Sequence, residues 1–202
     1  MDIAHIKKLE KKIKDLHPNP VKKNHSMTNK GAKEMFSLFW FLHLKPVIDY
    51  SKELAKRYKA NMEIVWLSAI LHDIARLDDL EPHDEIGSKR AYSMLLREGF
   101  SKEIAEEVKK TILTHRCKKH KPKTLEQKIL ATADAISHFK PPFYIWFTSI
   151  SSKPLKEQLA SSLLKLERDY NEKIFFEDER KSVKKEYEVL KSWFKYHSKI
   201  TQ

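Results

Sequence analysis

An all-α fold is predicted for this chain by three features of its sequence. Only three glycines occur in 202 residues, so few positions suit the tight turns that join β-strands. Lys, Glu, Leu and Ala, which favour helices, are abundant. Apolar residues recur at helical spacing in successive segments, the pattern of helices that bury one face. A chain of this length fits one domain with a full core, alone or with additional helices.

The N-terminal part is predicted to hold a helix over 2–16, a polar connection and a second helix over 31–43. Pro46 then either kinks the second helix or lies in the first turn of a new helix that runs to about Lys59. His43 is therefore expected at a kink or a helix boundary. The apolar face of the first helix consists of Ile6, Leu9, Ile13 and Leu16.

Capping residues mark the helix ends of the central part. Gly99 suits a C-terminal cap, and Ser101 can cap the start of the next helix. Thr124 and Gln127 form the pattern of a capping box. The helices predicted from these signals cover 83–97, 101 to about 115, and a segment from 124 that carries Asp134, and an apolar run predicts a further helix over 60–73.

Beyond Lys140 the composition changes. Residues 141–147 are an aromatic turn without an assigned structure, and amphipathic helices are predicted over 154–168 and 178–197. The apolar stripe of the last helix is expected to pack on the core, and its members are Val183, Tyr187, Leu190 and Phe194. We divide the chain into an N-terminal helix with its connection at 1–30, a core at 31–140 and a C-terminal helical extension at 141–202.

The adjacent pair His72-Asp73 is the strongest functional signal. It closes the apolar run Trp66–Leu71, and an imidazole beside a carboxylate can bind one metal ion or let the carboxylate bridge two. The dipeptide alone is weak evidence, because His83-Asp84 repeats it. Further metal-ligating residue types lie on or at the ends of predicted helices: His43, His83, His115 and Asp134.

This ordered set resembles the HD superfamily of metal-dependent phosphohydrolases over about residues 36–140. The segments "LSAILHDIAR", "HDEIGSKRAYSMLLREGF" and "TLEQKILATADAISHF" are similar to helices of HD domains. The resemblance implies a helical bundle with additional N- and C-terminal helices and a metal site at the centre of the bundle. It implies that His43, His72, Asp73 and Asp134 hold the principal metal. It also implies one of two roles for His83 and His115. They either bind a second metal, with Asp73 bridging the two metals, or contact substrate phosphate.

Histidine and carboxylate ligands suit Mn, Fe, Zn, Ni or Co, and we expect one or two such divalent ions per chain. The expected reaction is hydrolysis of a phosphate ester or anhydride of a small phosphorylated compound, with a nucleotide as the expected class. Asp73 is the expected catalytic residue that holds or deprotonates the attacking water. Arg76 and Arg116 are expected to bind substrate phosphate, because a guanidinium can grip it through two hydrogen bonds.

Two branches of the superfamily are disfavoured. Alarmone hydrolases place a Glu-Asp pair at the third and fourth positions after the motif aspartate, whereas this chain has Arg76-Leu77 there. Acids arrive only at Asp78-Asp79, from where one could still act as a general acid or base. The Gly-Tyr-Pro signature of the cyclic-di-nucleotide phosphodiesterases does not occur.

The remaining reactive residue types are expected to have other roles. His138 follows Asp134 by four residues on the same helix face, where it can support the site without binding metal. Cys117 is interpreted as an incidental thiol. The histidines expected on the surface or in loops are His5, His17, His25, His120 and His197.

The formal charge of +12 has two interpretations: a solvated, Lys-rich helical surface, which we favour, or a nucleic-acid-binding surface. The local cluster Lys118–Lys123 comes without a zinc-finger spacing or an aromatic RNA-binding motif. The same charge would attract a phosphorylated substrate.

No apolar stretch approaches the roughly 20 residues that span a bilayer, so no membrane partner is expected. The start of the chain is unlike a secretion signal, and the lone Cys117 excludes an internal disulfide. We therefore expect a cytoplasmic protein, and a homodimer is compatible with the sequence.

Two alternative functions stay open. Six ligands in this order can also hold the iron pair of an HD-type di-iron oxygenase, which would show a visible absorption band and oxygen consumption. A basic nucleic-acid-binding helical module would show salt-dependent retention on DNA or RNA without turnover.

Overall fold

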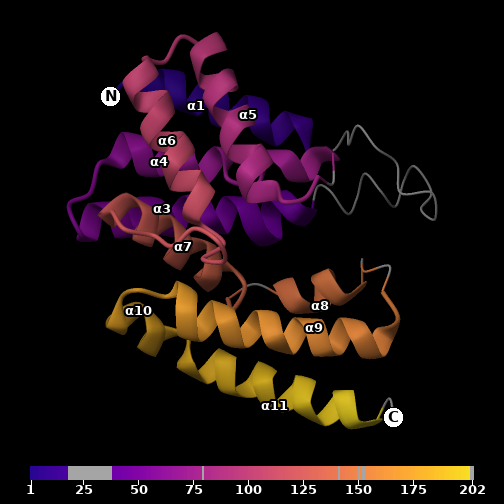
Figure 1. Cartoon of the computed structure of the whole chain (residues 1–202). Coiled ribbons are helices and arrows are strands. Elements are labelled where there is room, and N and C mark those ends of the chain that lie inside the picture. Colours follow the sequence, from indigo (N-terminus) through magenta and orange to yellow (C-terminus); the bar gives the residue numbers. More distant parts are fainter. Residues whose placement is uncertain (18–37, 79, 141, 150, 152, 201–202) are drawn as a thin grey trace.

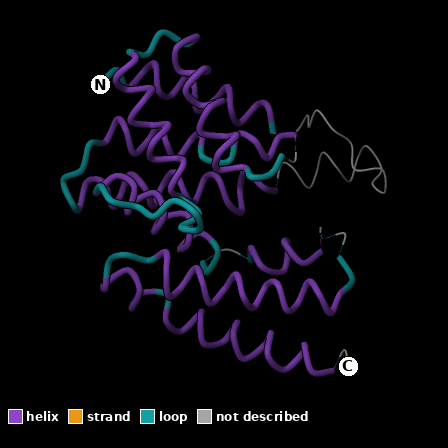
Figure 2. The backbone as a smooth tube through the Cα atoms, in the orientation of Figure 1, coloured by secondary structure: helices purple, strands orange, loops and turns teal. Residues whose placement is uncertain are grey.

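Helices are the only regular secondary structure in the described part of the computed structural model, which covers residues 1–17, 38–78, 80–140, 142–149, 151 and 153–200 (Figure 2). The predicted all-α fold is confirmed. No helix among these residues is both long enough and apolar enough to cross a membrane. In chain order the elements are α1 (Ile3–Leu16), η1 (Trp40–Leu44), α3 (Lys45–Arg57), α4 (Met62–Leu71), η2 (Ile74–Asp78), α5 (His83–Arg97), α6 (Lys102–Thr114), α7 (Leu125–Ser137), α8 (Phe143–Ser149), α9 (Leu155–Arg168), η3 (Asp169–Lys173), α10 (Glu177–Ser182) and α11 (Lys184–Ile200).

The helices form two layers that meet at α7 (Figure 1). One layer is a bundle around α4, which packs against α1, α3, α6 and α7, while α5 packs along α6. The other layer contains α8 to α11, with α11 lying along α9. Because α7 packs on α3 and also contacts η3, it belongs to both layers.

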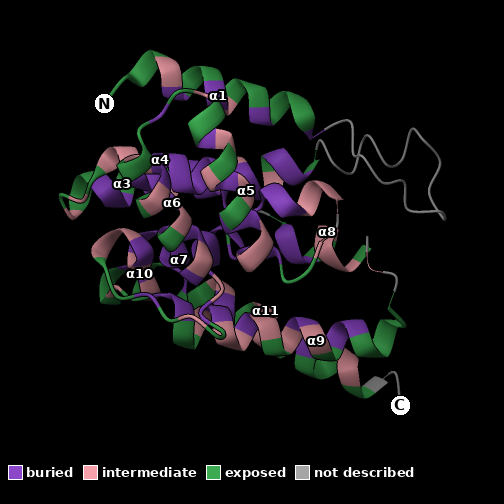
Figure 3. Ribbon diagram, turned by 45° about the horizontal axis from the view of Figure 1, so that its top comes forward, coloured by how far each residue is buried: buried purple, intermediate pink, exposed green. Residues whose placement is uncertain are grey.

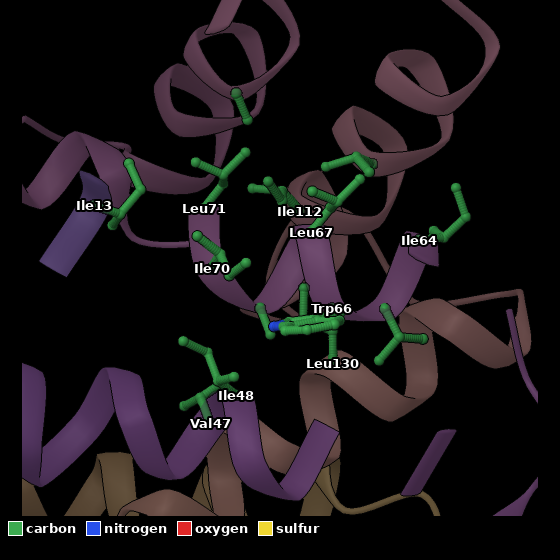
Figure 4. Packing of buried hydrophobic residues seen from close by; sticks show 14 of the residues in the cluster. Ile13, Val47, Ile48, Ile64, Trp66, Leu67, Ile70, Leu71, Ile112 and Leu130 are labelled. Carbon is green, nitrogen blue, oxygen red and sulfur yellow. The ribbon is translucent and has the colours of Figure 1, made fainter. Parts of the chain in front are cut away.

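The core of the first layer is centred on α4, whose residues from Ile64 to Leu71 are all buried (Figure 3). Side chains of the neighbouring helices converge on it, among them Ile48, Ile112 and Leu130 (Figure 4). A helix that is apolar on every face is stable only where protein surrounds it on every side. The apolar run before His72-Asp73 therefore gives the pair a rigid support.

The C-terminal helices have a second apolar cluster. Val183, Tyr187 and Phe194 of the predicted stripe are buried there together with Ile136 and Phe139 from the end of α7 and the residue after it. Leu190, the fourth member of the predicted stripe, is partly buried against the same cluster.

Several predicted helix boundaries need correction. Trp40–Leu44 is a π-helical turn, and Pro46 lies in the first turn of α3. The helix predicted over 60–73 ends at Leu71, so that His72 caps it and Asp73 lies beyond it. The aromatic segment after Pro142 forms the helix α8. The last predicted helix is two helices, α10 and α11, which meet at Val183. Part of the helix predicted over 31–43, and His25, lie outside the described residues.

The predicted caps are present. The Ser101 hydroxyl accepts a hydrogen bond from the backbone N–H of Ile104, and Thr124 and Gln127 form the complete capping box. Gly99 has a φ of +86°, a conformation that side chains with a Cβ rarely adopt. Local sequence signals therefore set the ends of α5, α6 and α7, the three helices that surround the functional site.

Candidate metal centre

The His72-Asp73 pair lies in the turn between α4 and η2, where α5 passes close by. A Cβ on Gly87 of α5 would lie 3.3 Å from the carbonyl oxygen of His72, so glycine permits this close approach. The approach brings His83, the first residue of α5, to Asp73. The close helix packing thus assembles one side of the site.

The other predicted residues reach the same place from three more elements. His43 lies in the π-turn η1, His115 caps the end of α6, and Asp134 belongs to α7. π-Helical turns often occur at functional sites, because the wider turn redirects a side chain. All six predicted residues are buried, and they form two groups whose ligand atoms could each hold a metal ion: His43, His72 and Asp134; and Asp73, His83 and His115.

The two carboxylate oxygens of Asp73 face different histidines. Oδ2 lies 3.4 Å from His43 Nε2 and 3.7 Å from His72 Nε2. Oδ1 lies 3.3 Å from His83 Nε2 and 3.8 Å from His115 Nε2. Asp73 therefore stands between the two groups with one oxygen toward each.

Asp134 completes the first group through one of its oxygens. Its Oδ1 lies 3.4 Å from His43 Nε2 and 3.9 Å from His72 Nε2. The Nε2 atoms of these two histidines are themselves only 3.2 Å apart. Three side chains from three elements thus point their ligand atoms at one position.

Hydrogen bonds at Nδ1 fix the orientation of all four histidine rings. Nδ1 of His72 donates to the carbonyl of Ala69 at 2.9 Å, and Nδ1 of His115 donates to the carbonyl of Ile112 at 2.6 Å, since a carbonyl can only accept. Nδ1 of His83 lies 3.0 Å from a carboxylate oxygen of Glu81.

His43 is held in the same way by a hydroxyl. The Ser137 hydroxyl donates to the carbonyl of Asp134 at 2.7 Å, which leaves its oxygen to accept from His43 Nδ1 at 2.9 Å. A proton on Nδ1 leaves the lone pair of Nε2 free, and the Nε2 atoms of all four rings point inward.

The surroundings favour the neutral form of three of the histidines and the charged form of Asp134. Burial lowers the pKa values of His43 and His83, and lowers that of His115 far more. Burial alone would raise the pKa of Asp134, but the ammonium of Lys173 holds it well below its usual range. Neutral imidazoles and ionised carboxylates are the protonation states that bind metals.

The donor set fits a divalent transition metal. Oδ1 of Asp73 is buried and has no hydrogen-bond partner in the described structure, which is costly for a carboxylate oxygen. Free Nε2 lone pairs of His43 and His72 face one another at 3.2 Å, an arrangement that a bound cation would stabilise. Neither feature is expected of an ordinary packed core.

Sequence reasoning missed Lys173 and Asp169, which reach the site from the C-terminal helices. The buried ammonium of Lys173 pairs directly with Asp134 Oδ2 and lies 3.5 Å from Asp169 Oδ1. His138 accompanies them, with Nε2 3.7 Å from Asp134 Oδ1 and Nδ1 2.8 Å from Asp169 Oδ2. No motif marks Lys173, and the helical spacing of 154–168 was its only nearby signal.

Two other expectations concern single residues near the site. His17, expected on the surface or in a loop, is instead buried at the end of α1 against Phe39 and Trp40, where burial lowers its pKa to about 4. Cys117 is also buried, and burial raises the pKa of its thiol to about 11, which is unsuitable for a nucleophile.

The two arginines expected to bind substrate phosphate meet at Glu81. Arg76 Nη1 lies 3.1 Å from Glu81 Oε1, and Arg116 Nη1 lies 2.8 Å from Glu81 Oε2. Glu81 is half-exposed and also contacts His83, so the arginines lie beside the second group. The acidic neighbour Asp78 pairs with Arg90 instead, and Asp79 lies outside the described residues.

Comparison with known proteins supports the family that the sequence resembles. The HD domain model matches residues 40–138. No curated protein matches the chain. A solved structure of a predicted HD superfamily hydrolase from an uncultured Thermotogales bacterium aligns with a TM-score of 0.57 and 20% sequence identity, and the alignment covers 98% of this chain and 94% of that one. At this identity the likeness concerns the fold, and it extends to the C-terminal helices beyond the HD domain.

Proposed function

The chain belongs to the HD superfamily through the HD domain at residues 40–138, and we propose that it is a metal-dependent phosphohydrolase. Its substrate would be a phosphate ester or anhydride of a small phosphorylated compound, and a nucleotide is the class we favour. The observation that carries this proposal is the position of Asp73, whose oxygens face two separate groups of inward-pointing histidines.

We assign His43, His72, Asp73 and Asp134 to a first metal, and His83 and His115 to a second metal or to substrate phosphate. Imidazole and carboxylate donors favour Mn, Fe, Zn, Ni or Co over an ion that requires oxygen ligands alone. A divalent ion bound there would supply a water of lowered pKa and positive charge beside a phosphoryl oxygen. Asp73, with a free oxygen at the centre, is the residue we assign to hold or deprotonate the attacking water.

Substrate phosphate would bind at Arg76 and Arg116. Both guanidiniums already form ion pairs with the carboxylate of Glu81. A carboxylate and a phosphate are both anions with two oxygens that can accept hydrogen bonds from a guanidinium. A phosphoryl group that replaced Glu81 there would lie beside His83, next to Asp73. A phosphoryl group bound in this way would bring the scissile phosphorus near a water held by Asp73.

Metal analysis followed by a nucleotide panel tests the proposal. Protein purified without chelator should contain between one and two transition ions per chain and release phosphate or pyrophosphate from at least one nucleotide without oxygen. A chain that never binds a transition metal would contradict the central assignment. Oxygen consumption with a visible absorption band, and no phosphate release, would indicate the di-iron oxygenase instead.

A cytoplasmic location is also proposed, supported by the buried thiol of the lone Cys117, which fits a reducing compartment. Fractionation of cells that express the chain tests this assignment. Recovery of the chain with membranes or outside the cell would contradict it.

A further inference from the structure

A buried lysine from the C-terminal helices enters the metal centre. Lys173 is the last residue of the π-helical turn η3, which follows α9 directly, and its side chain is 3% exposed. Its ammonium contacts Asp134 Oδ2 and lies 3.5 Å from Asp169 Oδ1. A charged lysine is rarely found fully buried without a partner, and here it lies between two buried carboxylates.

The contact divides the two oxygens of Asp134 between different partners. Oδ2 is taken by Lys173, whereas Oδ1 points at His43 and His72. A carboxylate held by one oxygen cannot rotate freely, so its other oxygen keeps its direction. Lys173 therefore fixes the rotation of the Asp134 carboxylate so that one oxygen faces the histidines.

Asp169, which forms an ion pair with Lys173, is itself fixed in position. Its Oδ2 accepts hydrogen bonds from Lys165 Nζ at 2.7 Å and from His138 Nδ1 at 2.8 Å. The backbone of η3 is tied to α7 as well, because the Thr132 hydroxyl donates to the carbonyl of Lys173 at 3.3 Å. Lys173 is thus fixed both through its charge and through its main chain.

Packing alone does not account for a lysine at this position. A methionine has a similar length and would fill the space without the cost of burying a charge. The ammonium adds an electrostatic contact to Asp134 and a link between this residue and the C-terminal helices. Both effects act on a residue that we assign to the first metal.

We propose that Lys173, held by Asp169, is a positioning residue of the metal centre that turns Asp134 Oδ1 toward the first metal. The affinity for that metal then depends on the C-terminal helices, although they lie beyond the HD domain. This inference rests on the proposed function only in that it requires the first metal to bind where we assign it.

Titration of metal-free protein with Mn²⁺ tests the proposal. Lys173→Met should raise the dissociation constant of the first ion by roughly 10- to 100-fold, the usual effect of losing a group that orients a metal ligand. Lys191→Met is the matched control, because Lys191 also pairs with a carboxylate of the C-terminal helices, Glu167 at 3.0 Å, but contacts no residue of the centre. The control should change the dissociation constant by less than about threefold.

Two further measurements separate positioning from a purely structural role. Asp169→Asn, which keeps the shape of the side chain but removes its charge, should weaken Mn²⁺ binding in the same direction, and Lys173→Arg should bind more tightly than Lys173→Met. In the wild-type chain, bound Mn²⁺ should slow hydrogen exchange of the amides of η3, a result that does not depend on any variant folding.

The outcomes distinguish this proposal from the proposed function. A wild-type chain that binds neither Mn²⁺ nor Fe²⁺, Co²⁺, Ni²⁺ or Zn²⁺ would overturn the metal centre and the role of Lys173 together. Tight binding by the wild-type chain with an unchanged dissociation constant in a folded Lys173→Met variant would overturn the role of Lys173 alone. If Lys173→Met does not fold, unchanged binding in Asp169→Asn together with unchanged exchange in η3 overturns it equally.

Discussion

Asp73 is the residue on which the geometry of the site depends. Its Oδ2 faces the histidines of η1 and α4, and its Oδ1 faces those of α5 and α6. Asp73 belongs to the second group and directs its other oxygen at the first, so it is expected to matter for both, whereas His83 and His115 belong to the second group only. Substitutions at these positions should therefore have unequal effects on the first metal.

Alanine variants test this division. His72→Ala and Asp73→Ala should abolish both metal binding and turnover, because each removes a ligand that we assign to the first metal. His83→Ala and His115→Ala should leave the first ion largely bound while reducing activity. Metal content by elemental analysis, measured beside phosphate release, checks the prediction. Equal loss of the first ion in all four variants would contradict it.

Arg76 is the second residue with a specific expectation. Arg76→Ala should leave the fold and metal content intact and lower kcat/KM by roughly ten- to a thousand-fold, the scale of losing one or two charge-assisted hydrogen bonds at about 1.5–3 kcal/mol each. Arg76→Lys should restore part of the loss, because it returns the charge without the bidentate geometry. Steady-state kinetics on a phosphorylated substrate measure the effect.

Arg90→Ala is the control for this variant. Arg90 also pairs with an acid, Asp78, but neither contacts Glu81 or the histidines. Its loss should cost at most about 1 kcal/mol of stability and leave kcat/KM unchanged. If Arg76→Ala also leaves kcat/KM unchanged, Arg76 forms only the ion pair with Glu81.

Sequence reasoning identified six of the residues that meet at the site, and it did so because they form an ordered set on helix-patterned segments. Their roles as ligands stay predictions. Lys173 could not be identified in the same way, because its partner Asp134 lies on another helix and a lysine in a Lys-rich chain carries no signal. The role that we propose for it depends on burial, which follows from the packing of η3 on α7 and α9.

At the scale of elements, capping signals predicted helix ends better than apolar periodicity did. The signals at Gly99, Ser101 and Thr124 are local, so the sequence reveals them directly. The π-turns at Trp40–Leu44 and Asp169–Lys173 were missed, since apolar spacing cannot show that one extra residue is accommodated within a turn. These two turns carry His43 and Lys173, so the unpredicted geometry lies at the site itself.

Gly99 gives a prediction at this scale. Gly99→Ala should destabilise the protein by about 1–2 kcal/mol, because a residue with a Cβ is strained at a φ of +86°. Metal binding should not change, since the α5–α6 turn lies away from the metal centre at the opposite end of α5 from His83. Chemical denaturation measures the stability, and Mn²⁺ titration measures the binding. Unchanged stability would show that the turn adopts another conformation without cost.

For the whole molecule, the first apolar cluster includes Ile6, Leu9 and Ile13 of α1 and the second begins within α7, so the division of the chain at residues 30 and 140 stays a proposal. α7 contributes Ile129, Leu130 and Ala133 to one cluster and Ala135 and Ile136 to the other. Because α7 packs in both clusters, it connects them. Asp134 lies in α7 between the residues that belong to the first cluster and those that belong to the second. Binding of a metal ion at the centre should therefore influence the stability of both layers.

Thermal unfolding with and without metal tests this coupling. An ion that binds only the folded chain stabilises it by RT ln(1 + [L]/Kd), which is about 2.7 kcal/mol at a hundredfold excess over Kd. For a chain of this size, Mn²⁺ should then raise Tm by roughly 5–10 °C, and a chelator should reverse the change. Because α7 joins the clusters, bound Mn²⁺ should slow amide hydrogen exchange in α4 of the first layer and in α11 of the second layer together. His72→Ala is the control and should show no rise in Tm. Slower exchange confined to one layer would mean that the C-terminal helices unfold independently of the metal centre.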